Sequence, residues 1–199
     1  MRPPRIFLLY FSYMQDYTQL AQILNHYLSA FTIVGAVAIS GAALIVLYFA
    51  YNKPETLSKY AKVLGSCIFP VGFLITFGGM FLTLFYSQVL GYAPCDLCWY
   101  QRVFLYPQVF MFAYAWYKKD RNVLPYTLLL SLTGLAVGIY HHMLQIGFDI
   151  MKPCSSAPFA VDCAKPSFIE FGFVTFPFMS VVLFAFLSLL MIVAMRFKK

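Results

Sequence analysis

Stretches of more than twenty residues without a charge most constrain what this chain can fold into. Segments 28–51, 63–90 and 171–195 contain no Asp, Glu, Lys or Arg. A helix needs about 20 mostly apolar residues to cross the hydrocarbon core of a bilayer. Because unpaired backbone groups are not tolerated in lipid, such segments are expected to be helices. The sequence therefore predicts at least three membrane-spanning helices.

Two further segments are apolar apart from a few polar residues. Segment 98–117 contains Arg102 near its start, and segment 123–146 contains His141 and His142 near its end. Over the whole chain 62% of residues are hydrophobic and 11% are charged, whereas about a quarter of the residues in a globular protein are charged. We therefore expect an all-α membrane protein with five transmembrane helices and mostly membrane lipid around it.

Basic residues predict which side of the membrane each loop faces. Loops 52–62 and 118–122 and the C-terminal tail are rich in Lys and Arg, and they alternate along the chain with the other connections. The positive-inside rule places these segments in the cytoplasm. Loops 91–97 and 147–170 then lie outside. The net charge of +7 is mostly this topology signal, and we expect no nucleic-acid partner.

The first residues combine a basic start with a short apolar run, but no small-residue cleavage site follows. We expect 1–27 to be an N-terminal interfacial segment, followed by a transmembrane helix over 28–51. The alternative is an over-long start, with Met14 as the true beginning. The other four helices would form one domain over 64–196.

Four of the five cysteines fall in or beside the two outer loops. They form two local pairs, Cys95 with Cys98 and Cys154 with Cys163. Cys67 lies within a predicted span, where a free thiol usually packs as a small hydrophobic group. The outer face of a bacterial-type membrane is oxidising, so disulfides persist there.

Three interpretations of these four cysteines are open from the residues alone. Two structural disulfides are one, although short loops gain little from cross-linking. A four-thiolate zinc site is another, since zinc sites often use C-x₂-C pairs, but an oxidising compartment works against four reduced thiols. We favour the third, an electron relay through thiol–disulfide exchange.

The environment expected for Cys98 favours its thiolate. Cys98 lies in the first turn of the predicted helix, where the helix dipole and free backbone amides favour an anion. Arg102 follows four residues later and can share the same face. Both environments lower a thiol pKa, and the thiolate is the nucleophile. Alternatively, Arg102 is an interfacial anchor that extends to the lipid headgroups.

His141 and His142 lie near the outer end of a predicted span, in the sequence "GIYHHMLQIGFD". Ionisable groups inside a membrane are functional candidates, although two interfacial histidines satisfied by water are the alternative. A dithiol oxidised in a membrane also needs an electron acceptor. No haem, Rossmann or iron–sulfur motif is present, and aromatic residues make up 20% of the chain, so we expect a lipid-soluble quinone.

Three motifs carry a resemblance to a known family. The sequence "CDLCWYQR" resembles the C-x-L-C-x-x-Q/E-R motif of the DsbB/BdbC disulfide-bond formation proteins. "YHHMLQ" is similar to the end of one of their helices, and "PCSSAPFAVDCAKPSFIEFGFVTFPFMS" is similar to their second cysteine loop and last helix. The resemblance covers about 64–196. It implies an antiparallel four-helix transmembrane bundle in the bacterial inner membrane, with its cysteine loops outside and its C-terminus in the cytoplasm.

The resemblance also implies a role for each cysteine. The partner would be a DsbA-like thioredoxin-fold protein, whose reactive thiolate attacks Cys154. Cys163 would then exchange with Cys95, which links the two outer loops. This exchange would release Cys98 as a thiolate that contacts the quinone, either ubiquinone or menaquinone.

Arg102 and His141 would lie near that quinone. His141 is preferred to His142 because "HHMLQ" aligns with a family His-x-M-L-Q pattern through its first histidine. The vitamin K epoxide reductase family is an alternative that also couples four cysteines to a quinone, but there the loop pair precedes the C-x-x-C. The chain departs from DsbB-like proteins in its extra N-terminal helix, 28–51.

Overall fold

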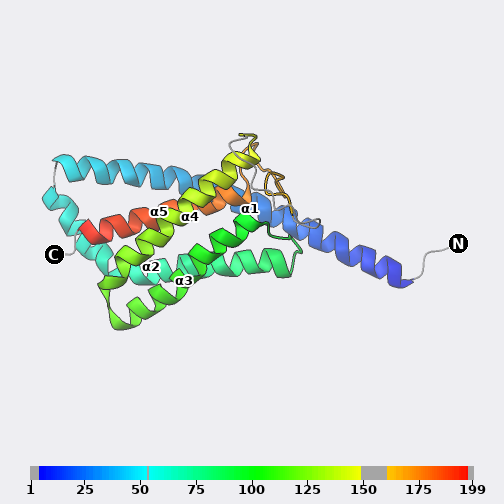
Figure 1. Ribbon diagram of the computed structural model, residues 1–199, viewed down its shortest axis with the longest axis horizontal. Helices are drawn as coiled ribbons and strands as arrows, with labels where there is room; N and C mark the ends of the chain where they lie inside the picture. Colours follow the sequence, from blue (N-terminus) through cyan, green and yellow to red (C-terminus); the bar gives the residue numbers. More distant parts are fainter. Residues whose placement is uncertain (1–4, 53, 149–160, 197–199) are drawn as a thin grey trace.

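The computed structural model describes the backbone of residues 5–52, 54–148 and 161–196 (Figure 1). Within these ranges the chain is helical apart from the connections and one isolated β-bridge between Glu170 and Val174. The elements in chain order are α1 Arg5–Asn52, α2 Pro54–Gln88, α3 Asp96–Lys118, the short 3₁₀ helix η1 Arg121–Val123, α4 Leu124–Gln145 and α5 Phe176–Arg196.

Four of these helices contain stretches that are long and apolar enough to cross a membrane, namely those in α1, α2, α4 and α5. Helix α3 corresponds to the remaining predicted span, 98–117, but is less apolar. Its Arg102 and Gln108 are buried inside the protein, where lipid does not reach them. The chain is therefore an all-α, multi-pass membrane protein, as the sequence predicts.

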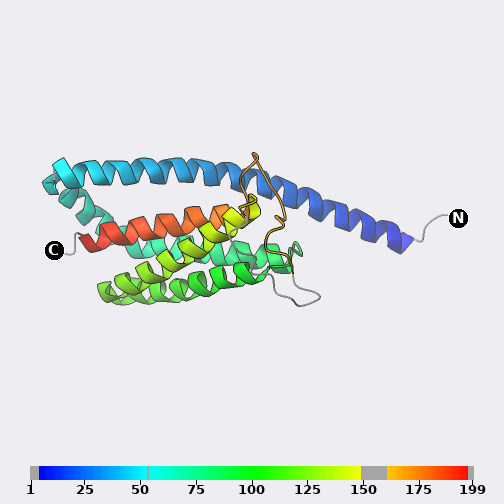
Figure 2. The same cartoon turned by 45° about the horizontal axis from the view of Figure 1, so that its top comes forward.

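Helices α2 to α5 form a four-helix bundle in which each helix packs on two others. The neighbouring pairs are α2 with α3, α3 with α4, α4 with α5, and α5 with α2. Successive helices run in opposite directions (Figures 1 and 2). The core includes Phe112 and Phe184, whose rings lie close to Gly72 and Gly134 on facing helices. Small residues at such crossings let membrane helices approach closely.

Helix α5 begins five residues later than the predicted span at 171. Phe171 and Gly172 have left-handed backbone angles, φ 52° and 81°. Glu170 and Val174 close this turn with two backbone hydrogen bonds of 3.0 and 2.9 Å. A helix cannot run through such angles, and it starts instead at Phe176, directly before Pro177.

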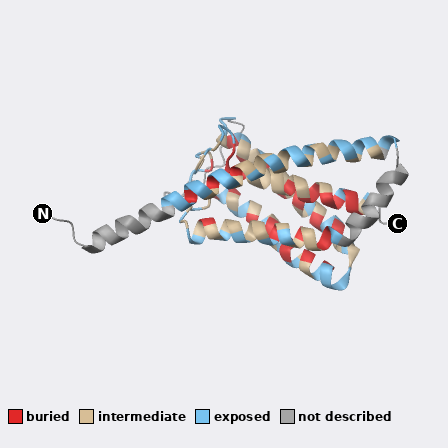
Figure 3. Cartoon of the chain, turned by 180° about the vertical axis from the view of Figure 1, so that it is seen from behind, coloured by how far each residue is buried: buried red, intermediate tan, exposed pale blue. Residues whose placement is uncertain are grey.

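Helix α1 packs against α5 and α2 on one flank of the bundle. It is continuous from Arg5 to Asn52, so no helix break separates the interfacial segment and the span expected on either side of residue 27. Most of its described residues are exposed (Figure 3). The division of the chain into these domains stays a prediction.

The two ends of the bundle carry different segments. The α2–α3 connection and residues 161–175 lie at one end, beside the N-terminal half of α1 (Figure 2). The end of α1, the start of α2, η1 and the end of α5 lie at the other. This arrangement is compatible with the predicted topology, in which the basic segments share one side.

Candidate functional site

Cys95 and Cys98 lie where α3 begins. Cys95 is the N-cap residue with extended backbone angles, and Cys98 lies in the first turn. Cys95 Sγ donates to Cys98 Sγ at 3.5 Å. Bonded disulfide sulfurs are about 2.05 Å apart, so these thiols need only a small side-chain movement to form one.

Cys163 reaches the same place from the segment before α5. Its side chain packs with Cys95, Leu97 and Leu144. Its sulfur interacts with that of Cys95 and with the backbone of Leu97 and Asp96 at the start of α3. Cys95 thus contacts both Cys98 and Cys163. Cys154, the fourth predicted site cysteine, lies outside the described residues.

Two of these thiols are held in their protonated form. The hydrogen bond to Cys98, together with burial, raises the pKa of Cys95 to about 12. Burial raises the pKa of Cys163 to about 11, although hydrogen bonds from the Leu97 and Asp96 backbone oppose the shift. Because Cys95 donates to the Cys98 sulfur, negative charge is favoured on Cys98.

His141 is fully buried beside Cys95, between two glutamines. Its Nε2 lies 3.6 Å from Cys95 Sγ and 3.3 Å from Gln145 Nε2, and its Nδ1 lies 3.3 Å from Gln101 Nε2. Gln145 Nε2 also donates to the Cys163 carbonyl at 3.4 Å. These five residues connect α3, α4 and the Cys163 segment through one polar network.

The tautomer of His141 follows from this network. With Gln145 donating to both Cys163 and His141, Nε2 of His141 is the acceptor and Nδ1 carries the proton. Gln101 then accepts from Nδ1 through its amide oxygen, with its amide group turned around relative to the 3.3 Å contact. This assignment leaves Gln145 Oε1 as a buried, unpaired acceptor. It also directs the Nε2 lone pair to the side on which Cys95 lies.

Arg102 turns into the bundle and does not extend toward headgroups. It is 8% exposed, and its Nη2 donates to the main-chain carbonyl of Thr83 on α2 at 3.0 Å. Its guanidinium lies 5.1 Å from the Trp99 ring centroid. The anchor interpretation therefore does not fit the structure. A buried positive charge one turn after Cys98 favours an anion there.

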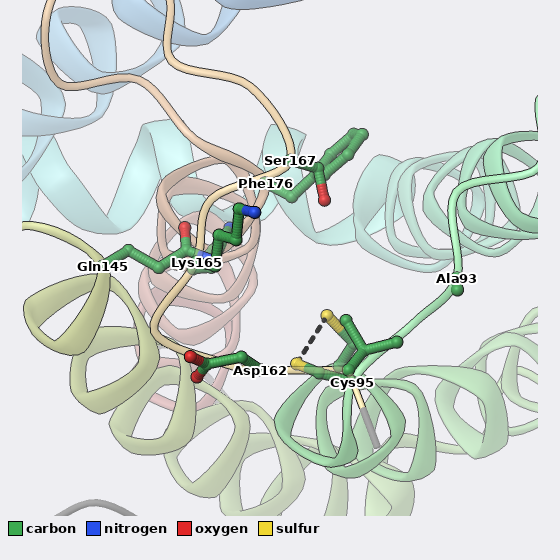
Figure 4. A pocket seen from close by; sticks show the side chains of 10 residues that line it. Ala93, Cys95, Gln145, Asp162, Lys165, Ser167 and Phe176 are labelled. Atoms are coloured by element: carbon green, nitrogen blue, oxygen red, sulfur yellow. Dashed lines mark hydrogen bonds between the residues drawn. The ribbon is translucent and has the colours of Figure 1, made fainter. Parts of the chain in front are cut away.

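A small pocket opens on the sulfurs from the loop end of the bundle (Figure 4). Cys95, Gln145, Asp162 and Lys165 line it together with Phe176. The lining comes from the α2–α3 connection, α3, α4, the Cys163 segment and α5, so Cys95, Cys98 and Gln145 border one cavity together with the segment that bears Cys163.

Sequence reasoning missed Thr83 and Gln145 and left Gln101 without a role. Gln145 follows His141 by four residues, a spacing that places both on one helix face and could have identified it. Thr83 acts through its backbone, which leaves no mark in the sequence. His142 belongs elsewhere, since its Nδ1 lies 3.2 Å from Thr175 Oγ1 on the α5 side.

Three residues of the site could also hold a metal ion. The possible ligand atoms of Cys95, Cys98 and His141 lie within 4.8 Å of one another. Thiolate and imidazole are the ligands that zinc prefers in proteins. The arrangement can therefore support either thiol–disulfide exchange or metal coordination.

Comparisons with known proteins point to the first of these. Residues 65–194 match the family model described as disulfide bond formation protein DsbB. The chain is 39% identical over 113 residues to the SPbeta prophage-derived disulfide bond formation protein B of Bacillus subtilis (strain 168), covering 57% of this chain and 75% of the relative.

Two further relatives agree in their names. A probable disulfide formation protein of Oceanobacillus iheyensis is 36% identical over 145 residues, which is 71% of this chain and 95% of the relative. Disulfide bond formation protein C of Bacillus subtilis (strain 168) is 34% identical over 111 residues, 55% of this chain and 78% of the relative. No solved structure matches the chain.

Proposed function

We propose that this chain, which belongs to the DsbB family of disulfide bond formation proteins, is a thiol:quinone oxidoreductase that reoxidises a thioredoxin-fold disulfide donor. Family membership and the membrane-spanning helices indicate a disulfide oxidoreductase in a membrane. The observation that carries the finer proposal is the contact of Cys95 with both Cys98 and Cys163. A sulfur with two thiol neighbours can exchange one disulfide partner for the other.

The proposed relay begins with Cys95–Cys98 and Cys154–Cys163 disulfides. A thiolate of the partner attacks Cys154, the Cys154–Cys163 bond breaks, and Cys163 leaves as a thiolate. Cys163 attacks Cys95, which forms a Cys95–Cys163 bond and releases Cys98. The partner's second thiol resolves its bond to Cys154, so the partner loses two electrons and two protons. Cys154 then retakes Cys163 and leaves Cys95 and Cys98 reduced.

We assign to His141 the proton that Cys95 must lose before its disulfide with Cys98 re-forms. Its Nε2 is 3.6 Å from Cys95 Sγ, and the basic nitrogen of a neutral imidazole is a common proton acceptor in enzymes. The high pKa of Cys95, about 12, makes such a base useful. The two glutamines hold the ring, so the acceptor nitrogen stays directed at the sulfur.

The residues around Cys98 fit a lipid-soluble quinone. Cys98 is partly exposed, and Trp99, Tyr100 and Val103 present more than half of their surface outward beside it. Arg102 is a nearby source of N–H donors for a quinone oxygen. A quinone bound there would accept the two electrons and two protons that closure of the Cys95–Cys98 disulfide releases.

Removal of the Cys98 sulfur tests this function. In purified protein supplied with quinone and a reduced thioredoxin-fold protein, Cys98→Ala is expected to abolish quinone reduction, because Cys95 loses the sulfur with which it closes the cycle. Cys67→Ala is the control and should retain full turnover, since Cys67 is exposed on α2 away from the site. Undiminished quinone reduction by Cys98→Ala would refute the assignment.

Metal binding without turnover is the second candidate function, favoured by the compact set of Cys95, Cys98 and His141. Elemental analysis of the purified protein separates the two. One zinc ion per chain that persists while the thiols turn over no substrate would support the metal site. Absence of stoichiometric metal in active protein would support the oxidoreductase.

A further inference from the structure

The extra helix α1 lies outside the family match at 65–194, and it contacts the bundle most closely at the cysteine end. Among residues 18–49, the described buried residues are Ala21, Asn25 and Ser29. Their spacing of four places them in one stripe on the helix. From 30 to 49 every residue is at least partly exposed. The helix is therefore fixed beside the loops and only loosely packed further along.

Asn25 makes a buried hydrogen bond into the bundle. The hydroxyl of Tyr86 on α2 donates to Asn25 Oδ1 at 2.8 Å. Asn25 is 3% exposed and Tyr86 is 5% exposed. Polar bonds of this kind hold membrane helices together at a defined position, because neither group has another partner in lipid.

Ring contacts connect Tyr86 with both cysteine-bearing segments, the α2–α3 connection and the Cys163 segment. Its ring meets Phe176 edge-on at 4.8 Å and Tyr92 at 5.7 Å, and Phe176 meets Phe168 edge-on at 4.5 Å. Tyr92 precedes Cys95 by three residues, and Phe168 lies in the Cys163 segment, five residues after Cys163. Phe176 also lines the pocket that contains the sulfurs. This aromatic cluster of Tyr86, Tyr92, Phe168 and Phe176 thus lies against both segments.

His26, the next residue of α1, contacts the Cys163 segment directly. Its Nδ1 lies 3.6 Å from Glu170 Oε2, and its ring centroid lies 5.3 Å from that of Phe171. Glu170 and Phe171 belong to the turn that the bridge to Val174 closes. Two neighbouring residues of α1 therefore reach the two segments whose cysteines must meet.

We infer that α1 is a positioning element for disulfide exchange. Asn25, through the aromatic cluster, and His26, through Glu170 and Phe171, hold the two segments so that Cys163 stays against Cys95. The rate of an exchange within one molecule depends on how well the reacting groups are held in place. Loosening α1 therefore lowers the effective concentration of Cys163 at Cys95. The inference rests on the proposed relay, because it concerns the exchange between these two cysteines.

The experiment isolates this one pair of thiols. In a chain carrying Cys67→Ala, Cys98→Ala and Cys154→Ala, only Cys95 and Cys163 remain. Equilibration with glutathione follows a balanced reaction, in which two protein thiols and one oxidised glutathione give one protein disulfide and two reduced glutathiones. At half oxidation, the squared concentration of reduced glutathione divided by the concentration of oxidised glutathione gives the effective concentration. Adding Asn25→Leu is expected to lower it about tenfold.

Matched variants distinguish the possible failures. Phe31→Leu, on the outward face of α1 at 76% exposure, is the control and should leave the effective concentration unchanged. Equal values for Asn25→Leu and Phe31→Leu would overturn the inference while the relay stands. Failure of the unmodified pair to form a Cys95–Cys163 disulfide at any ratio would overturn the relay itself.

A second variant covers loss of folding in Asn25→Leu. His26→Ala removes a side chain that is 59% exposed, so folding should be retained, and it should also lower the effective concentration. An unchanged value for His26→Ala, in protein whose thermal transition matches that of Phe31→Leu, would contradict the role of α1 in holding the Cys163 segment.

Discussion

At the scale of single residues, the cysteines of the site differ in how readily they lose a proton. Cys95 and Cys163 favour the thiol, whereas negative charge is favoured on Cys98. Cys95 and Cys163 have raised pKa values, through a hydrogen bond and burial in the first case and burial in the second. Cys98 receives the Cys95 hydrogen bond and has Arg102 one turn away. The thiols are therefore chemically unequal although they are close together.

The alkylation of Cys163 should report this inequality. Its pKa rises from the ordinary 9.0 to about 11, so at pH 8 its thiolate fraction is about 100-fold below that of the same thiol in unfolded chain. In reduced protein, iodoacetamide labelling measured by peptide mass spectrometry should keep accelerating up to about pH 11. Labelling in denaturant is the control and should level off near pH 9.

The same shift has a consequence for stability. The unfolded chain loses this proton near pH 9 and the folded chain only near pH 11, so the stability of the reduced protein falls between these values. A labelling profile that levels off near pH 9 in folded protein would show that burial does not protect the thiol.

Gln145→Leu tests the positioning of His141. The change removes the donors to His141 Nε2 and to the Cys163 carbonyl, so the tautomer and the direction of the base are no longer fixed. Turnover with quinone and a reduced partner should fall about tenfold or more. The neighbouring Met143→Leu should leave turnover unchanged. Equal turnover in the two variants would mean that His141 acts without Gln145.

Part of the site could be predicted from its residues, and part could not. Local spacing gives the Cys95–Cys98 pair and Arg102 four residues on, because a helix fixes which residues share a face. The contact between Cys163 and Cys95 joins segments 68 residues apart, and family resemblance rather than spacing suggested it. The role of Thr83 depends on a backbone carbonyl and could not be predicted.

At the scale of elements, helix contacts explain why a polar α3 belongs in a membrane bundle. Gln108 bonds to Ser131 on α4 at 3.0 Å, and Arg102 bonds to Thr83 on α2. The polar groups of α3 are thus satisfied by its neighbours. Composition predicted α3 and its position. Only these hydrogen bonds explain why a helix of such low hydropathy fits in the bundle.

The crossing of α4 and α5 gives a sharp test of packing. A Cβ added at Gly134 would meet the Phe184 ring at 2.5 Å, whereas a Cβ at Gly78 would meet nothing within 4 Å. Gly134→Ala should destabilise the bundle by about 1–3 kcal/mol, less up to about 1 kcal/mol from improved helix propensity. Gly78→Ala should be neutral or stabilising. Thermal unfolding in detergent followed by tryptophan fluorescence would reveal the difference, and equal transitions would contradict this packing.

The continuity of α1 illustrates what sequence reasoning cannot see. A basic start and a change in hydropathy favoured two segments, one on either side of residue 27, yet the helix runs unbroken through it. Hydropathy reports the solvent that each residue meets, and a helix can pass from one solvent to another without a bend. Asn25 and Ser29 are polar and yet buried, because they lie against the bundle.

At the scale of the whole molecule, the alternating helices place all described cysteines of the site at one end of the bundle. The positive-inside rule predicts that this end is extracytoplasmic. In a cysteine-free background, Val161→Cys near the site should react with a membrane-impermeant maleimide on intact cells. Asn122→Cys in η1 should react only after permeabilisation. The reverse pattern would place the site in the cytoplasm and remove the oxidising environment that the relay needs.

The attachment of α1 to one side of the bundle also affects from which side a molecule in the bilayer can approach the cysteines. Because α1 packs on α2 and α5, it covers that side of the bundle. The α3 surface that bears Trp99 and Tyr100 is exposed. A hydrophobic reactant that diffuses in the bilayer could therefore approach Cys98 along the α3 surface, which α1 does not cover. Neighbouring proteins that cover the α3 surface would slow the arrival of such a reactant at Cys98. Proteins that bind along α1 would not.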